Sequence, residues 1–462
     1  MIRPRIGLLF LYVPFYENIA PVRGEKLAFA RDLGERLAAV MDVTEYPLVM
    51  TEEDAATAGA QLSSEPVDAV VVAPAVATFG ALGWAALQRI SQPVCLWNVQ
   101  PDAGVSPAYD IAGLIRNSGG LGIQALANTL AREGRRFTVV FSTGAGAVPE
   151  KLVRFAQAAA VWRRLRSARF GRIGSTFPQM TDIAMNAAAW PGQPPVPVPA
   201  SGILEAYERQ SDAAVAGRVS EIRTSHSVAE ITEDELSRSA RLSLALDTIV
   251  GEHALDGGAF NCHAENCLQN DRIGVTACYG VSRQTSAGRP FSCTGDLPTA
   301  IAMKVLQDLA GAVIYGELDL VDEGRGVVLL ANGGEGDFNA ASGPVRIAGN
   351  ENFAGLRGRG ASLGFEPFHG PGTILSFTPL ESDARYRLIA AEGLVEPAPP
   401  TRLGVFHAGF RFRGLGARGA FERWCEAGAV HHVAIAPGEW MAHLRELSRI
   451  SGFELHVIGG NA

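Results

Sequence analysis

Four carboxylate side chains follow two short apolar runs in the sequence. Glu317 and Asp319 follow the first run, and Glu335 and Asp337 follow the second. Short apolar runs bounded by Gly and Asp are typical of buried strands, and α/β proteins usually place their chemistry just past such strand ends. If the two strands are adjacent, the carboxylates face one cleft and could hold a hard divalent ion such as Mn²⁺ or Mg²⁺. The alternative is that these acids cap turns or helices.

Two adjacent histidines, His431 and His432, precede a helical pattern near the C-terminus. A histidine together with carboxylates suits such an ion, which polarises hydroxyl and carbonyl oxygens while a neighbouring carboxylate moves a proton. For a histidine pair considered alone, packing or surface exposure is the competing explanation.

A second group of metal-ligating residue types lies upstream, at Cys262, His263, Glu265 and Cys267. Structural zinc sites combine two pairs of such ligands, and the sequence shows no second pair. We therefore expect no zinc site there. Hydrolysis by a Ser-His-Asp triad is also unsupported, because the sequence has no Gly-X-Ser-X-Gly motif.

The composition is that of a large globular protein. The chain has 462 residues, of which 47% are hydrophobic and 19% charged, so it is long enough for two or three domains. Its formal net charge of −8 gives no support for nucleic-acid binding. No run reaches the roughly 18 to 20 apolar residues needed to span a bilayer, so we expect neither a nucleic-acid nor a membrane partner.

The cysteines give no sign of a disulfide framework, because none forms a Cys-X-X-Cys pair and such frameworks are unusual in so long a chain. Reduced thiols are typical of a cytoplasmic protein, which is the location we expect. The six cysteines are Cys95, Cys262, Cys267, Cys278, Cys293 and Cys425.

The first third of the chain alternates strand and helix patterns, which predicts βαβ units with a parallel sheet. The predicted strands cover residues 5–13, 67–73, 93–98 and 137–141. A glycine-rich turn that begins at Asn117 precedes a helix. Such a turn can hold an anion, but the match to Gly-X-Gly-X-X-Gly is poor, and an ordinary tight loop facing a cleft is the alternative.

The rest of the chain predicts two further domains. A new strand at residues 168–173 begins a second α/β unit, and after Asn339 short alternating runs separated by turns predict a barrel-like or sandwich-like unit. The predicted fold is therefore two Rossmann-like α/β domains followed by a C-terminal β-barrel-like domain. The predicted boundaries are residues 1–168, residues 169–339 with the active-site strand ends, and residues 340–462 with a terminal helix and the His-His segment.

The stretch ACYGVSRQTSAGRPFSCTGDLPTAIAMKVLQDLAGAVIYGELD, residues 277–319, resembles the L-fucose isomerase and L-arabinose isomerase superfamily. In that family the first of these strands usually ends in Cys-Glu-Gly-Asp or Ala-Glu-Gly-Asp. Further likeness, in the same order as in the family, comes from residues 170–180 (FGRIGSTFPQM), 369–377 (HGPGTILSF), 386–393 (YRLIAAEG) and 428–433 (GAVHHV).

The resemblance implies an aldose–ketose isomerase that uses Mn²⁺, or Mg²⁺ in its place. In the family two carboxylates and a histidine bind the ion, and the carboxylates shuttle protons through an enediol. One carboxylate falls on Glu317, or on Asp319 if the alignment shifts by two residues, so both are expected as catalytic residues and metal ligands. The histidine ligand falls on His432, or on His431.

Two family positions differ in this chain. Thr294 stands where the family has its first glutamate, and Asn332 stands where arabinose-type members have a histidine. The Thr294 hydroxyl cannot replace a carboxylate as a base, because it is not appreciably ionised near neutral pH. Glu335 or Asp337 could supply the missing charge from the adjacent turn. We expect Thr294 and Asn332 to contact the substrate instead.

The resemblance also implies a small-molecule carbohydrate substrate. The first hypothesis is a sugar isomerase, and the second is a lyase or decarboxylase that acts on a sugar acid or sugar phosphate. The third is a non-catalytic sugar-binding homologue. Family members assemble as trimers or hexamers with substrate pockets at subunit contacts, so we expect a homo-oligomer in which Asn117 reaches a substrate in a neighbouring subunit.

Overall fold

The computed structural model describes residues 2–46, 48–144, 146–263, 267–351, 359–380 and 385–460. The chain divides into two compact units. The smaller unit contains residues 2–163 together with residues 442–452, and the larger unit contains residues 164–441 together with residues 453–460. The chain therefore leaves the larger unit near its C-terminus, completes the smaller one, and returns.

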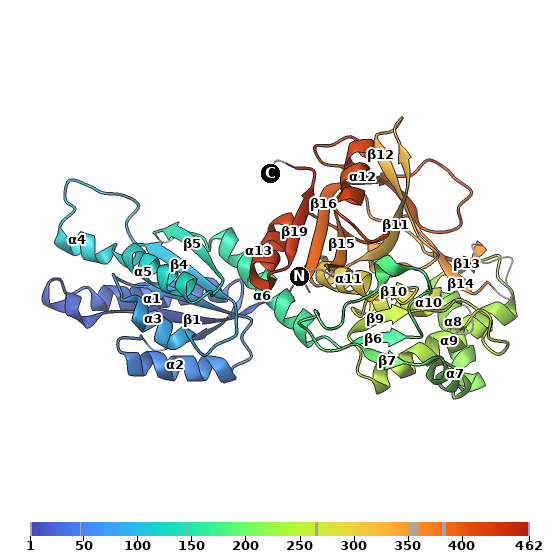
Figure 1. The fold of residues 1–462 in the computed structure, drawn as a ribbon, viewed down its shortest axis with the longest axis horizontal. Coiled ribbons are helices and arrows are strands. Elements are labelled where there is room, and N and C mark those ends of the chain that lie inside the picture. The colour runs from blue at the N-terminus through green and yellow to red at the C-terminus, as the bar shows by residue number, and fades with distance from the viewer. Residues whose placement is uncertain are drawn as a thin grey trace. The chain divides into compact units, whose positions relative to one another are not determined.

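The described residues of the smaller unit form a five-stranded parallel sheet of order β2-β1-β3-β4-β5 (Figure 1). Apolar side chains pack on both faces of this sheet, in two separate clusters, which is why its central strands are continuous apolar runs. The strands are β1 (Arg5–Leu11), β2 (Asp42–Glu45), β3 (Ala69–Pro74), β4 (Val94–Gln100) and β5 (Phe137–Thr143). The helices are α1 (Arg23–Ala38), α2 (Glu52–Ser64), α3 (Gly80–Leu87), α4 (Ile111–Arg116), α5 (Gly119–Arg132) and most of α6 (Glu150–Ser167).

The parallel βαβ organisation predicted for this part of the chain is confirmed, and the four predicted strands correspond to β1, β3, β4 and β5. The edge strand β2 was not predicted. Its sequence, Asp-Val-Thr-Glu, is polar and partly exposed, so it lacks the apolar run that identifies a buried strand.

The last helix of the chain, α13 (Met441–Ser451), completes the smaller unit. Ile450 packs against the apolar cluster on one face of the sheet. Thr138 Oγ1 donates a hydrogen bond of 2.9 Å to the buried carboxylate of Glu446, and His443 Nε2 lies 2.9 Å from Gln157 Oε1.

The larger unit begins with a four-stranded parallel sheet of order β10-β9-β6-β7. A small three-stranded sheet of order β14-β13-β8 lies elsewhere in the unit. The strands are β6 (Phe170–Ile173), β7 (Val196–Val198), β8 (Ser227–Val228), β9 (Gly257–Phe260), β10 (Phe291–Cys293), β13 (Arg346–Gly349) and β14 (Ala361–Gly364). The helices are α7 (Ala200–Glu208), α8 (Asp212–Ser225), α9 (Glu233–Glu252), α10 (Cys278–Ser286) and α11 (Leu297–Ala310).

In the described part of the larger unit, six antiparallel strands close into a barrel, in the order β15-β18-β11-β12-β17-β16 with β16 pairing back to β15. Strand β19 pairs with β16 in parallel at the side of the barrel. Figure 1 shows the barrel strands in yellow, orange and red. The six barrel strands are β11 (Ile314–Asp322), β12 (Val327–Ala331), β15 (Gly370–Leu380), β16 (Arg385–Pro397), β17 (His407–Phe412) and β18 (His432–Pro437). Strand β19 (Glu454–Ile458) and helix α12 (Ala417–Glu426) belong to the same unit.

Strands β11 and β12 form an antiparallel pair in this barrel, whereas the sequence pattern assigned them to the central parallel sheet. The reason is the short connection, residues 323–326, since parallel neighbours need a crossover of about a dozen residues or more. Barrel strands therefore begin at residue 314, before the predicted barrel-like segment of residues 340–462. Among the described helices, none combines the length and apolarity needed to cross a bilayer.

Candidate active site

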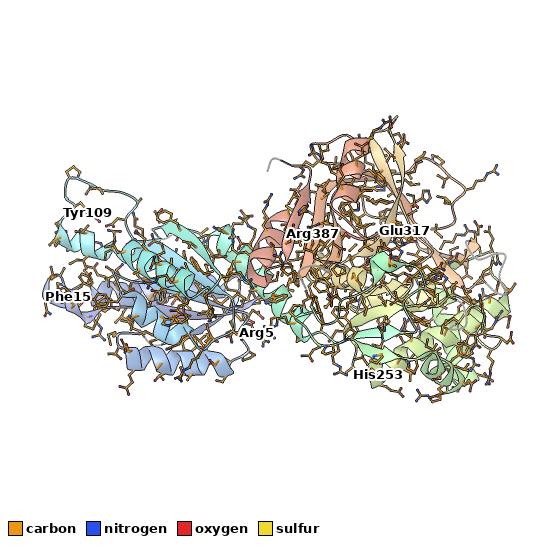
Figure 2. All side chains as sticks on the ribbon, viewed as in Figure 1. Arg5, Phe15, Tyr109, His253, Glu317 and Arg387 are labelled. Carbon is orange, nitrogen blue, oxygen red and sulfur yellow. The ribbon has the colours of Figure 1, made fainter. Side chains whose placement is uncertain are left out.

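A cavity of about 340 Å³ lies in the larger unit, between the ends of β9 and β10 and the barrel strands β11 and β18. Glu317, labelled in Figure 2, projects from β11. The polar lining includes Cys262, His263 and Cys293 from the sheet and Glu317, Glu335 and His432 from the barrel side.

Glu317 and His432 form the central pair of this site. The antiparallel register of β11 and β18 places the two residues directly opposite each other. Glu317 Oε1 lies 3.4 Å from His432 Nε2, and the side chain of His432 is only 2% exposed. The Tyr315 ring packs against the imidazole, with 4.8 Å between ring centroids. Residues 115 positions apart in the sequence are thus brought together by strand pairing alone.

Asp296 fixes the orientation of His432. Its Oδ2 lies 2.8 Å from His432 Nδ1, and this carboxylate is completely buried. Its Oδ1 accepts a hydrogen bond of 2.9 Å from the backbone N–H of Thr299 and so caps the N-terminus of α11. A carboxylate on one imidazole nitrogen leaves the other nitrogen aimed at its target, as in carboxylate–histidine–metal arrangements.

This arrangement makes His432 a strong base that is held as a cation. Burial lowers the pKa of His432, but the hydrogen bonds and negative charges of Asp296 and Glu317 raise it to about 9. Burial likewise raises the pKa of Glu317, but the hydrogen bond from His432 and the charges of both histidines bring it below its usual value. In the absence of a bound ion, the pair therefore carries opposite charges at neutral pH.

His431 joins Glu317 and His432 in a group whose ligand atoms all lie within 4.8 Å of one another. Its Nδ1 lies 2.5 Å from Asp182 Oδ2, and both side chains are 43% exposed. One carboxylate and two imidazoles, each oriented by an aspartate, are donors that divalent ions such as Mn²⁺ accept. The residues present therefore fit the ion that the resemblance implies, and both histidines rather than one are in position.

Asp319, the other expected carboxylate, lies outside this group of three. It occupies a β-bulge between Leu318 and Leu320, where the register of β11 and β12 shifts. The residue is exposed overall. Partial desolvation of its carboxyl group, and then the negative charge of Glu317, raise the pKa of Asp319.

Thr294 lines the cavity at the end of β10. Its φ is +54° and that of Gly295 is +81°, so two consecutive residues adopt the left-handed conformation, which is unusual for a β-branched side chain. A Cβ at Gly295 would lie 2.7 Å from the carbonyl oxygen of Ser175, so glycine is required there. The Thr294 hydroxyl is buried and has no hydrogen-bond partner in the described part of the chain.

Glu335 brings a second carboxyl group to the cavity. The residue is 3% exposed, and neither carboxyl oxygen has a hydrogen-bond partner among the described residues. Burial raises the pKa of Glu335 to about 7, and the negative charge of Glu317 contributes in the same direction. Asp337, the other possible substitute for the family glutamate, instead accepts backbone hydrogen bonds from Val313 and Asn339.

Asn332 shapes the turn that carries Glu335. Its Nδ2 donates hydrogen bonds to the carbonyl oxygens of Tyr315 (2.9 Å) and Glu335 (2.5 Å), and its Oδ1 accepts one from Gly334. This side chain therefore holds a loop and is not among the residues that line the cavity.

Asn117 is in the smaller unit, where it closes the turn after α4 through hydrogen bonds with Asp102 and Gly113. These hydrogen bonds explain why an asparagine suits this turn. Its expected role in the site of a neighbouring subunit stays a prediction.

The sheet side of the cavity holds a second group of metal-ligating side chains, which the sequence pattern identified only in part. Cys262, His263 and Cys293 have ligand atoms within 4.8 Å of one another. Of the other residues considered with Cys262 and His263, Cys267 packs in an apolar cluster, and Glu265 lies outside the described residues. Cys293 was missed because its proximity depends on the pairing of β9 with β10.

Asp296 and Tyr315 were also missed as site residues. The sequence Asp-Leu-Pro-Thr at 296–299 could have identified Asp296 as a helix cap, since Asp followed by Pro in the first turn is typical of a helix N-terminus. Tyr315 could not be distinguished from a core residue, because it directly follows the apolar residues 312–314 of the sequence. Its hydroxyl is buried without a hydrogen-bond partner in the described structure.

The structure thus defines a mixed α/β protein with parallel sheets, a closed barrel and a cavity lined by carboxyl, imidazole and thiol groups. No protein-family model matches the chain. The chain is 23% identical over 300 residues to a sulfoquinovose isomerase from Alkalicoccus urumqiensis. The match covers 63% of this chain and 65% of the relative's length, which is less than two thirds of it. This similarity supports a relationship to sugar isomerases.

The Asp296–His432 contact predicts how His432 titrates in the metal-free protein. Asp296→Asn keeps a good helix cap but removes the negative charge, so the pKa of His432 should fall from about 9 toward its usual value. Histidine NMR during a pH titration would measure this shift. Asp182→Asn, the same change beside His431, is the matched control and should leave His432 unaffected. An unchanged His432 titration in Asp296→Asn would contradict this account.

The unpartnered carboxyl of Glu335 predicts a pH-dependent cost in stability. Because its folded pKa of about 7 lies above the usual 4.5, the folded state loses stability as pH rises from about 4.5 to 7. Glu335→Gln should therefore stabilise the metal-free protein at pH ~8, by on the order of 3 kcal/mol, and hardly at all at pH ~4.5. Thermal unfolding at both pH values tests this, with the exposed Glu422→Gln as control. Equal effects at the two pH values would refute it.

Proposed function

We propose that this protein is a metal-dependent isomerase that interconverts an aldose and a ketose. The observation that carries the proposal is the pairing of the Glu317–His431–His432 group with the buried, unpartnered carboxyl of Glu335 on one cavity. The relationship to a sulfoquinovose isomerase supports the choice of reaction class. A bound Mn²⁺ or similar ion would polarise the sugar's hydroxyl and carbonyl oxygens.

The chain's own residues account for the proton transfer. An aldose becomes a ketose in two steps: a base takes the proton from C2 while O1 gains a proton, which gives an enediol, and a proton is then returned to C1 while O2 loses its proton. Glu335 is suited to both steps, since a carboxyl group with a pKa of about 7 can accept and return a proton near neutral pH. Glu317 stays ionised and can act as a ligand, because the hydrogen bond and charge of His432 outweigh the effect of burial and lower the pKa of Glu317.

In this proposal Glu335 replaces the carboxylate that the family carries at the position of Thr294. The Thr294 hydroxyl, which is buried without a partner among the described residues, is free to hydrogen-bond a sugar hydroxyl. The Tyr315 hydroxyl is available in the same way. Asn332 takes part indirectly, by holding the turn that presents Glu335.

The charges of the cavity favour an uncharged sugar as substrate. Its described lining contributes no lysine or arginine, and the cationic His432 is already balanced by Asp296 and Glu317. Burial lowers the pKa of His263, so that imidazole is not a cation at neutral pH. A sugar acid or sugar phosphate would lack a counter-charge in this part of the site.

Metal binding and activity test the proposal together. Wild-type protein should bind about one Mn²⁺ per chain, and Glu317→Gln should lose both the ion and the activity, because one of three protein ligands is gone. Glu335→Gln should keep the ion but lower kcat about 100-fold or more, as loss of an acid–base group does. Mn²⁺ content, and NMR of neutral aldoses and of sulfoquinovose during incubation, would measure these effects.

The control for these variants is Glu422→Gln, an exposed change on α12, which should match wild type in both assays. A protein that neither binds nor is stabilised by any divalent ion would contradict the metal-dependent mechanism. A protein that binds Mn²⁺ but turns over only sulfoquinovose would contradict the preference for uncharged sugars.

We also propose a homo-oligomer, as the resemblance to trimeric and hexameric enzymes implies. Light scattering after size-exclusion chromatography should give a mass of three or six chains. A monomer at micromolar concentration would contradict this, and would also remove the basis for a role of Asn117 in a neighbouring site.

A further inference from the structure

The thiol and imidazole groups on the sheet side of the cavity come from two adjacent parallel strands. Cys293 ends β10 and pairs with Phe260, the last residue of β9. Cys262 and His263 follow Phe260 after one intervening residue, Asn261. The carboxyl ends of neighbouring strands therefore present three metal-ligating side chains at one edge. His263 Nε2 lies 3.8 Å from Cys293 Sγ, and all three ligand atoms lie within 4.8 Å of one another.

These donors differ in kind from the Glu317 group. Two thiolates and an imidazole suit a borderline-soft ion such as Zn²⁺, whereas carboxylate oxygen suits harder ions such as Mn²⁺. Cys262 is buried and His263 and Cys293 are half-buried, so the group lies in the cavity wall and not on the open surface.

We propose that Cys262, His263 and Cys293 bind one Zn²⁺ through two sulfur atoms and one nitrogen, with the fourth position open to the cavity. All three residues line the same cavity as Glu317. Three protein ligands and one open position are the arrangement of catalytic zinc sites, whereas structural sites are closed by four. The open position would take water or an oxygen of a bound molecule. Binding replaces one proton on each thiol with the metal, so both protons are released to solvent.

This site is independent of the proposed isomerase activity, because it uses none of the residues assigned to that reaction. The two proposals can therefore fail separately. The cavity would then hold two ions that prefer different ligands: Zn²⁺ on sulfur and nitrogen at the sheet side, and Mn²⁺ on carboxylate and imidazole at the barrel side.

Cobalt titration of the full-length protein tests the site, because Co²⁺ replaces Zn²⁺ and reports its ligands. The reduced protein is first freed of metal by chelation and then titrated with Co²⁺. We expect a thiolate-to-cobalt charge-transfer band and the intense visible bands of a tetrahedral ion, saturating at one equivalent. Co²⁺ binding to the metal-free protein should release two protons, one from each cysteine, measured by an indicator dye, and Zn²⁺ should then abolish the bands with no further proton release. Excess Mn²⁺ should leave them in place.

Single variants identify the ligands. Cys262→Ser and Cys293→Ser should each remove most of the charge-transfer intensity. Cys278→Ser is the matched control, because its thiol lines the same cavity but accepts a hydrogen bond from Asn350 and is not part of the group. It should keep the bands. His263→Gln, at a half-buried residue that should tolerate substitution, should keep the charge-transfer band but weaken Co²⁺ binding at least about 10-fold.

The controls separate this site from the isomerase proposal. Glu317→Gln should lose Mn²⁺ while keeping the cobalt spectrum, and Cys293→Ser should do the reverse. The zinc site is overturned if Co²⁺ gives only weak octahedral bands, or if the charge-transfer band persists without both cysteines. It is equally overturned if the band disappears with Cys278→Ser alone, or if Mn²⁺ displaces Co²⁺ from the wild type.

Discussion

The antiparallel pairing of β11 with β18 is the constraint on which the site depends. It places Glu317 opposite His432 in a barrel wall, where a nearly dehydrated imidazole would be costly without compensation. The compensation comes from Asp296, which belongs to the α/β part of the unit and also caps α11. One buried carboxylate thus completes a helix terminus and neutralises a barrel histidine. Loss of His432 would leave the buried Asp296 carboxylate without its ion-pair partner, and loss of Asp296 would leave His432 with Glu317 alone, so helix α11 and strand β18 hold each other in place.

The cavity between the barrel and the parallel sheet is lined by two groups of side chains that suit different metal ions. Its barrel side offers carboxylate and imidazole, and its sheet side offers thiols and imidazole. Glu335 interacts electrostatically with both sides, since its charge raises the pKa of Cys293 and its own pKa is raised by Glu317. A bound substrate would supply the hydrogen-bond partners that Glu335 lacks in the described structure. The carboxyl group whose charged form is disfavoured by burial is thus well placed to meet a substrate.

The sequence patterns predicted those elements whose character is set by neighbouring residues in the chain. The buried strands of the smaller unit are apolar runs, and they were found, whereas the polar edge strand β2 was not. Glu317 and His432 were predicted through family resemblance, and the register of β11 and β18 brings them together. Cys293 could not be placed, because its neighbours come from a strand about 30 residues earlier whose pairing leaves no mark on the sequence. The short turn between β11 and β12 did contain the information that they pair antiparallel, but apolar runs alone do not reveal strand direction.

The path of the chain through α13 has a consequence for biosynthesis. Residues 2–163 of the smaller unit are synthesised before residues 164–441, yet Ile450 packs on the apolar cluster of this unit and its buried Thr138 hydroxyl bonds to Glu446. Ile450 and Glu446 both belong to residues 442–452, so the unit lacks part of its packing until residues 164–441 have been translated. During that interval the sheet face that Ile450 covers lacks this helix. Synthesis and folding of the smaller unit are therefore separated in time, because its last helix follows most of the larger unit along the chain.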